Sequence, residues 1–156
     1  MTRGYGLLEG FLAQQRSRVA DALIPASLRT GRLLDIGCGA YPLFLAQTSF
    51  ARKFGLDKQV ATVAASLDRD GQSTVQLIRY DVEHGGHLPF RDDQFSVVTM
   101  LAVFEHIDII RLVALLSEVR RVLQPGGRLV LTTPTKIAHT LLRGMAKVYL
   151  VRIKWF

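Results

Sequence analysis

Three aspartates each follow a short apolar run, and a pair of glycines follows the first of them. The acids are Asp35, Asp57 and Asp81, and the glycines are Gly37 and Gly39. Because glycine has no Cβ atom, a ligand can approach the backbone N–H groups of such a turn closely. A helix beginning there would add unpaired N–H donors. Asp57 comes 20 residues after Gly37, where an acid can accept both hydroxyls of a ribose. The pattern predicts a nucleotide-like ligand.

Each of these signals also has a purely structural interpretation. A Gly-x-Gly turn can simply join a strand to a helix, and Asp57 can cap a helix that begins at Lys58. The three acids together make the stronger case, because the carboxyl ends of neighbouring parallel strands meet at one edge of a sheet. In open α/β sheets that edge is where ligands bind.

Apolar runs and helical patterns alternate along the chain, which predicts the sheet that would position these residues. Strands are expected at residues 32–36, 53–57, 74–81, 95–101 and 128–133, and helices at 7–23, from 41 onward, at 59–67 and at 111–123. Strands without clean alternation of apolar and polar residues are typical of a parallel sheet covered on both faces. With no internal repeat or linker, we predict one α/β domain with a Rossmann-like, doubly wound sheet.

Five stretches, in order and with typical spacing, carry a family resemblance. They are residues 33–39, 80–83, 88–98, 103–107 and 118–131. Together they resemble the motifs of class I S-adenosylmethionine-dependent methyltransferases, especially the type 11 branch that acts on small molecules and quinone precursors. The resemblance covers roughly residues 31–134.

The resemblance implies a cofactor and a reaction. S-adenosylmethionine would be the cofactor and S-adenosylhomocysteine the product, with a small-molecule acceptor methylated at oxygen, nitrogen or carbon and no metal involved. Asp35, Gly37 and Gly39 would shape the pocket for the methionine end of the cofactor.

Further roles follow from the same resemblance. Asp57 would hold the ribose hydroxyls, and Asp81 would contact the adenine amino group with Val82 beside the ring. Leu101 and Ala102, at the end of the fourth expected strand, would line the floor near the methyl-bearing sulfur.

A catalytic base is a weaker prediction. A sulfonium is already an activated methyl donor, so the protein mainly aligns the acceptor behind the methyl group. Glu105 and His106 are the candidates for deprotonating a hydroxyl or ammonium acceptor. We favour a structural interpretation, in which Glu105 caps a short helix and His106 packs over it. Cys38 is expected to be a small buried side chain rather than a nucleophile.

The sequence departs from the family pattern in its first motif. Residues 40–42, Ala-Tyr-Pro, replace the usual third glycine, so the Tyr41 ring would either crowd the methionine moiety or turn outward. Pro42 also stands where a nicotinamide dinucleotide site needs glycine or alanine, which argues against an oxidoreductase. Ser96 replaces the acid that commonly follows Phe95. The alternative function is a non-catalytic S-adenosylmethionine-binding module or partner subunit.

Composition restricts the setting of the protein. The 156 residues are 49% hydrophobic and 21% charged, which predicts an ordered globular fold. A single cysteine cannot form an internal disulfide, and we expect a cytoplasmic protein without a signal peptide or a transmembrane helix. The net charge of +7 would suit an anionic partner, but the basic residues are scattered and no aromatic-basic cluster indicates nucleic acid.

The C-terminal residues lead to three further expectations. Residues 136–151 are predicted to form a helix that packs on the sheet, an interpretation favoured over contact with a membrane surface. The domain would then divide into a helical cap (1–30), a Rossmann-like core (31–134) and a C-terminal helix (135–156). Such a fold would be truncated after the fifth strand, whose open edge predicts a homodimer.

Overall fold

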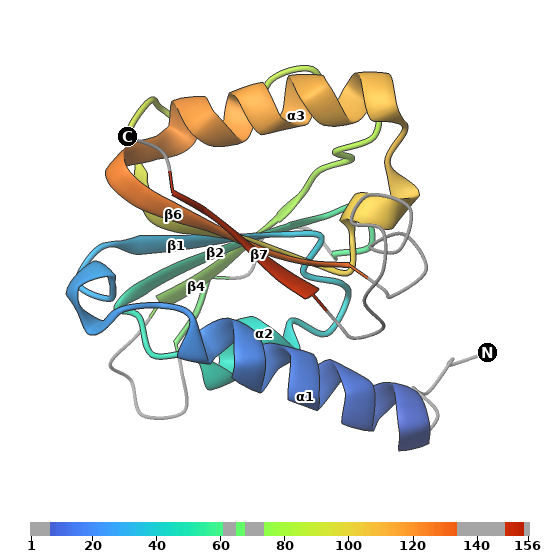
Figure 1. The fold of residues 1–156 in the computed structure, drawn as a ribbon, viewed down its shortest axis with the longest axis vertical. Coiled ribbons are helices and arrows are strands. Elements are labelled where there is room, and N and C mark those ends of the chain that lie inside the picture. The colour runs from blue at the N-terminus through green and yellow to red at the C-terminus, as the bar shows by residue number, and fades with distance from the viewer. Residues whose placement is uncertain (1–6, 61–64, 68–73, 134–148, 155–156) are drawn as a thin grey trace.

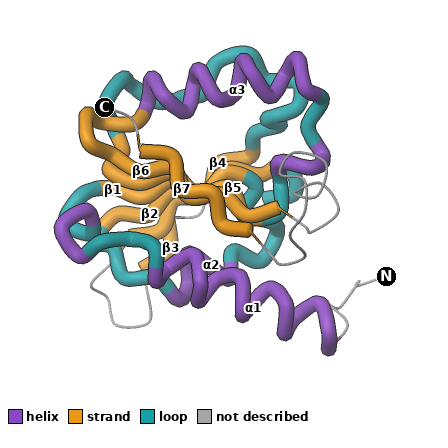
Figure 2. The backbone as a smooth tube through the Cα atoms, viewed as in Figure 1, coloured by secondary structure: helices purple, strands orange, loops and turns teal. Residues whose placement is uncertain are grey.

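A seven-stranded sheet with helices on both faces forms the described part of the chain, in the order β3-β4-β2-β1-β5-β6-β7 (Figures 1 and 2). The computed structural model describes residues 7–60, 65–67, 74–133 and 149–154. The strands are β1 (Arg32–Ile36), β2 (Arg52–Asp57), β3 (Ala65–Leu67), β4 (Thr74–Arg79), β5 (Phe95–Leu101), β6 (Leu123–Thr133) and β7 (Tyr149–Lys154). The helices are α1 (Leu7–Ala22), η1 (Ala26–Leu28), α2 (Leu43–Gln47), η2 (Phe104–His106) and α3 (Ile109–Val122).

The five inner strands are parallel, which confirms the Rossmann-like α/β fold. β4, β2, β1, β5 and β6 pair in parallel register, and only the outermost strands, β3 and β7, are antiparallel to their neighbours. Residues 95–100 of β5 are all buried, as expected of a central strand covered on both faces. The carboxyl ends of β1, β2, β4 and β5 therefore meet at one edge, called here the carboxyl edge; the opposite one is the amino edge.

Helices α1 and α2 cover one face of the sheet and α3 covers the other (Figure 1). α3 turns one apolar stripe to the sheet, and its buried residues are Leu112, Leu115, Val119 and Val122. Its N-terminus is capped by Asp108, whose carboxylate accepts the N–H of Ile110 at 2.9 Å. Among the described residues, no helix is long and apolar enough to cross a bilayer.

The prediction of a helix at residues 59–67 is wrong in its last part. Ala65–Leu67 is strand β3, antiparallel to β4, while residues 61–64 lie outside the described residues. The outer edge of β4 carries backbone N–H and C=O groups that need partners, and β3 supplies them.

The C-terminal expectations are also corrected. Residues 149–154 form β7, antiparallel to β6, so residues 149–151 are not helical; residues 136–148 lie outside the described residues. The sheet continues beyond the fifth parallel strand, and the edge of β6 is covered by β7. The expectations of a fold truncated after that strand, and of a dimer through its open edge, are therefore wrong.

Candidate functional site

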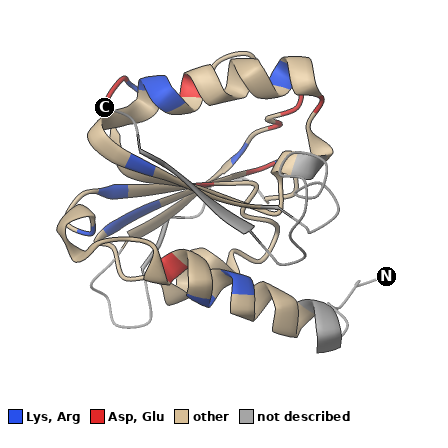
Figure 3. Ribbon diagram, in the orientation of Figure 1, with Lys and Arg blue, Asp and Glu red and all other residues tan. Residues whose placement is uncertain are grey.

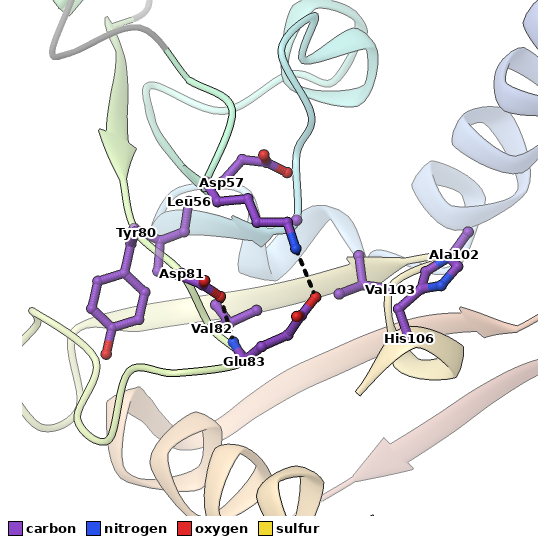
Figure 4. Close-up of a pocket in the computed structure, with 11 residues that line it drawn as sticks. Leu56, Asp57, Tyr80, Asp81, Val82, Glu83, Ala102, Val103 and His106 are labelled. Atoms are coloured by element: carbon purple, nitrogen blue, oxygen red, sulfur yellow. Dashed lines mark hydrogen bonds and ion pairs between the residues drawn. The ribbon is translucent and has the colours of Figure 1, made fainter. Parts of the chain in front are cut away.

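A cavity of about 420 Å³ opens at the carboxyl edge, between the ends of β1, β2, β4 and β5 (Figure 4). Three predicted acceptors or turn residues line it: Gly37, Asp57 and Asp81. The other lining residues are Leu56, Lys58, Tyr80, Val82, Glu83, Ala102, Val103 and His106.

The glycine turn after β1 packs tightly against the loop after β5. Gly37 has a φ of +74°, and a Cβ atom there would lie 2.2 Å from Cγ2 of Val103. Gly39 has a φ of +73°. The N–H of Gly37 donates to the carbonyl oxygen of Leu56 at 2.7 Å, so this amide holds the turn to β2. Only a residue without a side chain fits at position 37.

Asp57 ties the ends of β1 and β2 together. Its Oδ2 accepts the N–H of Gly39 at 2.9 Å, and its Oδ1 accepts the N–H of Gln59 at 2.7 Å. Since a carboxylate has about four acceptor positions, two remain for other donors. The capping and ligand-binding interpretations of Asp57 are therefore compatible, although Lys58 and Gln59 lie in a turn and not in a helix.

Asp81 is held by its own loop after β4. Its Oδ1 accepts the N–H of Glu83, and its Oδ2 lies 2.9 Å from Nδ1 of His84. The hydrogen bond from His84 is the main cause that lowers the pKa of Asp81, so this acid is ionised near neutral pH. Val82 lines the same cavity beside it.

An ion pair spans the cavity between the two acidic loops. Nζ of Lys58, next to Asp57, lies 2.9 Å from Oε1 of Glu83 (Figure 4). Arg111 on α3 donates to the carbonyl oxygen of Glu83. Sequence reasoning missed Lys58 and Glu83, although each lies within two residues of a predicted acid.

The loop after β4 is ordered by Tyr80. Its hydroxyl donates to the carbonyl oxygen of His87 at 2.7 Å, and a Cβ atom at Gly85 would lie 2.2 Å from that hydroxyl oxygen. The loop thus folds around the ring, which also forms part of the cavity wall.

Asp35 lies behind the cavity and does not line it. It is 3% exposed, and its Oδ1 accepts the hydroxyl of Thr99 at 2.6 Å. Burial, with a smaller contribution from the charge of Asp57, raises the pKa of Asp35 to about 7. Gly39, which bonds Asp57, is also absent from the lining.

The floor residue next to β5 is Ala102 and not Leu101. Ala102 lines the cavity with a φ of +58°, and its N–H donates to the carbonyl and hydroxyl oxygens of Thr132 at 3.1 and 3.0 Å. Leu101 instead packs against the cluster under α1 and α2. The polypeptide turns sharply at Ala102, and this turn aims the following loop over the cavity.

The structure places one of the two candidate bases, His106, at the cavity and buries most of Cys38. His106 lies exposed at the rim of the cavity, whereas the side chain of Glu105 lies outside the described residues. Burial raises the pKa of the Cys38 thiol, and the nearby charges of Asp35 and Asp57 raise it further. Cys38 is therefore a neutral thiol packed beside Gly55 and not a nucleophile. The ring of Tyr41 is 72% exposed and lies outside the cavity lining.

The fold and the position of the cavity define the class I methyltransferase type. Residues 34–131 match a family model described as a methyltransferase domain, and the chain belongs to this methyltransferase family. A probable S-adenosylmethionine-dependent methyltransferase of Mycolicibacterium smegmatis is 36% identical over 112 residues, 69% of this chain and 40% of that protein. The family implies S-adenosylmethionine as cofactor and S-adenosylhomocysteine as product.

A second curated relative agrees with this assignment, and a solved structure shares the fold. A 2-phytyl-1,4-naphtoquinone methyltransferase of Synechococcus elongatus is 32% identical over 127 residues, 78% of this chain and 53% of that one. The structure of the YcgJ protein of Bacillus subtilis has a TM-score of 0.57 at 23% identity, covering 78% of this chain and 51% of that chain. The chain spans between 39% and 53% of the length of the curated relatives it matches.

Proposed function

We propose that this chain binds S-adenosylmethionine in the cavity at the carboxyl edge and transfers its methyl group to a small-molecule acceptor at oxygen, nitrogen or carbon. The observation that carries the proposal is the convergence of Asp57 and Asp81 on one cavity closed by the Gly37 turn. An adenosine offers hydroxyl and amino donors at two separated positions, and the two carboxylates offer acceptors at two separated strand ends.

The residues around the cavity fit the cofactor in shape and charge. Gly37 lines the cavity, and the lining holds three acids against one lysine, which suits a ligand with a net positive charge. Asp57 would accept the ribose hydroxyls, Asp81 would accept the adenine amino group and Val82 would contact the ring. Asp35 would act from behind the Gly37 turn, on the ammonium of the methionine end.

The bound cofactor supplies an electrophilic methyl group, and the chain supplies position. Ala102 and Val103 would form the wall nearest the reacting centre, so that an acceptor lying over η2 is held in line. His106 at the rim would take up a proton when the acceptor is a hydroxyl or an amine.

The second candidate function is a non-catalytic binding module. It is favoured by one observation: among the described residues, no acid or carbonyl group is hydrogen-bonded to the imidazole of His106, which is exposed. An imidazole that is not oriented is a poor general base. The location in the cytoplasm, the acceptor and the absence of nucleic-acid binding stay predictions from the sequence.

Calorimetric titration of the purified chain with S-adenosylmethionine and S-adenosylhomocysteine tests the cofactor site. Asp57→Asn should weaken both ligands at least tenfold, because losing a charge-assisted hydrogen bond costs about 1.5–3 kcal/mol. Asp93→Asn makes the same change in charge at the amino edge and should leave both affinities unchanged. NADH should not bind.

Two results would separate the two functions or reject both. Affinity without turnover on a panel of phenols, quinones and amines would favour the binding module. A folded wild-type chain that binds neither S-adenosylmethionine nor S-adenosylhomocysteine would reject both functions.

A further inference from the structure

Several arginines gather toward the amino edge of the sheet, and the acids of the cavity lie at the carboxyl edge (Figure 3). These acids include Asp57, Asp81 and Glu83. Arginines lie in the first part of strands β1, β2 and β6 and in the segments that lead into β1, β5 and β6. In the described part of the chain these are Arg29, Arg32, Arg52, Arg91, Arg120, Arg121 and Arg128.

Two of these arginines already have acidic partners. Arg29 pairs with Asp21, and Arg121 pairs with Glu118 and Asp92. Arg32 and Arg52 differ, since neither guanidinium has a hydrogen bond or ion pair to another residue that the structure describes.

Arg32 and Arg52 lie side by side in one hollow. They are the first residues of the neighbouring parallel strands β1 and β2 and are partners in the register, so their Cα atoms are about 4.8 Å apart. Both line a second hollow, of about 370 Å³, together with Thr30, Asp93, Gln94 and Gln124. Two like charges at paired strand positions repel each other, which is unfavourable unless an anion lies between them.

The rest of the hollow can also bind an anion. Oε1 of Gln94 accepts the N–H of Arg91 at 2.9 Å, which leaves the NH₂ group of Gln94 as a donor. Gln124 brings a second amide from the start of β6. Asp93 is the single acid in the lining, so the hollow holds two positive charges against one negative charge.

We propose that this hollow is a binding site for a phosphoryl group, such as that of a phosphorylated small molecule. Guanidinium groups match phosphate oxygens with paired hydrogen bonds, and the two arginines leave the hollow with a net positive charge even beside Asp93. The hollow lies at the edge of the sheet opposite the methyltransferase cavity. S-adenosylmethionine carries no phosphate, so this ligand would be a different molecule from the cofactor.

Titration of the purified chain with pyrophosphate at constant ionic strength tests the site, by calorimetry and by thermal shift. Binding should saturate at one equivalent, and Arg52→Gln should weaken it about tenfold or more, since a charged hydrogen-bond pair is lost. Arg32→Gln should act in the same direction. The exposed Arg52 carries the test if the half-buried Arg32 variant is unstable.

Two variants make the test specific. Asp93→Asn should strengthen binding several-fold, because it removes the one negative charge in the hollow. Asparagine also tolerates the left-handed backbone at this position, where φ is +54°. Arg79→Gln removes an exposed arginine at the end of β4, at the carboxyl edge, and should leave the affinity unchanged.

Three results would overturn the proposal. They are the absence of saturable binding by the folded wild-type chain, a loss in Arg79→Gln as large as in Arg52→Gln, and weaker binding in Asp93→Asn. A nucleic-acid surface would be indicated instead by two results together. A short single-stranded oligonucleotide would bind more tightly than pyrophosphate, and Arg91→Gln would weaken its binding as much as Arg52→Gln. Titration of the same variants with S-adenosylmethionine should give unchanged affinities, so failure of the phosphoryl site can be told apart from failure of the methyltransferase site.

Discussion

Replacing Gly37 by alanine tests whether the turn of the methyltransferase site is held by close packing. The new Cβ atom would lie 2.2 Å from Cγ2 and 3.0 Å from Cγ1 of Val103, on a backbone with a φ of +74°. A left-handed backbone costs alanine about 1–2 kcal/mol. Overpacking costs about 1–3 kcal/mol more, so Gly37→Ala should lower the free energy of unfolding by about 2–5 kcal/mol.

Two further variants separate these contributions. Gly126 has a φ of +76°, and a Cβ atom added there would meet nothing within 4 Å, so Gly126→Ala should cost only the backbone part. Val103→Ala in the Gly37→Ala background should recover the overpacking part, and a double-mutant cycle should give a favourable coupling of about 1–3 kcal/mol.

Urea unfolding followed by circular dichroism measures five chains: wild type, Gly37→Ala, Gly126→Ala, Val103→Ala and the double variant of Gly37→Ala with Val103→Ala. Because the difference between the two glycine sites comes only from contact with Val103, Gly37→Ala should be the more costly by at least about 1 kcal/mol. Equal losses at Gly37 and Gly126, or no coupling with Val103, would refute the argument. The turn would then be held by its hydrogen bonds alone.

Two more predictions concern ionised groups. Burial raises the pKa of Asp35 from 3.8 to about 7, so the folded state holds a proton that the unfolded chain releases, and stability should fall as the pH rises from about 4 to 7. The total loss of stability attributable to Asp35 is on the order of 4 kcal/mol. Urea unfolding at pH 5 and pH 8 should therefore show a smaller change in the free energy of unfolding for Asp35→Asn than for wild type. Equal changes in the two chains would contradict this. Arg121→Ala would leave the carboxylate of Glu118, 14% exposed, without its ion pair, and should cost about 2–4 kcal/mol at pH 7. Arg79→Ala, as the control, should stay within about 0.5 kcal/mol of wild type, and a similarly small effect of Arg121→Ala would show that the Arg121 network adds little.

The parallel core could be predicted because its strands are buried on both faces. Residues 95–101 are mostly apolar, with Ser96 and Thr99 as the two polar exceptions, and such a run indicates a buried strand. After residues 32–36, Gly37 marks the end of the strand. The predicted and observed bounds of β1 and β5 are identical, and those of β2 differ by one residue.

The two antiparallel edge strands could not be predicted in the same way. Residues 65–67 are rich in small side chains and fit a helical pattern, and only the unpaired edge of β4 makes them a strand. Residues 151–154 alternate apolar and basic types, but the stretch 149–154 follows a segment with helical spacing. In both cases the deciding partner lies on another strand, so a local pattern carries little information about it.

At the site, the residues at strand ends could be predicted more easily than the contacts made by the loops that follow them. The convergence of Asp57 and Asp81 follows from parallel register, since each is close to the end of its strand. Leu101 was expected on the cavity floor, yet the sharp turn after β5 gives that place to Ala102. The Lys58–Glu83 ion pair depends on the path of two loops, and no spacing rule describes that path.

The fold brings together charged residues that are scattered in the sequence of this chain, whose net charge is +7. In the sequence the basic residues are scattered, and no single segment indicates a partner. In the fold, parallel strands bring Arg32 and Arg52 to one edge and Asp57 and Asp81 to the other. The carboxyl edge then attracts a cationic cofactor and the amino edge an anion, so the two ligands need not compete. The strand direction that builds the methyltransferase cavity thus also builds the arginine hollow.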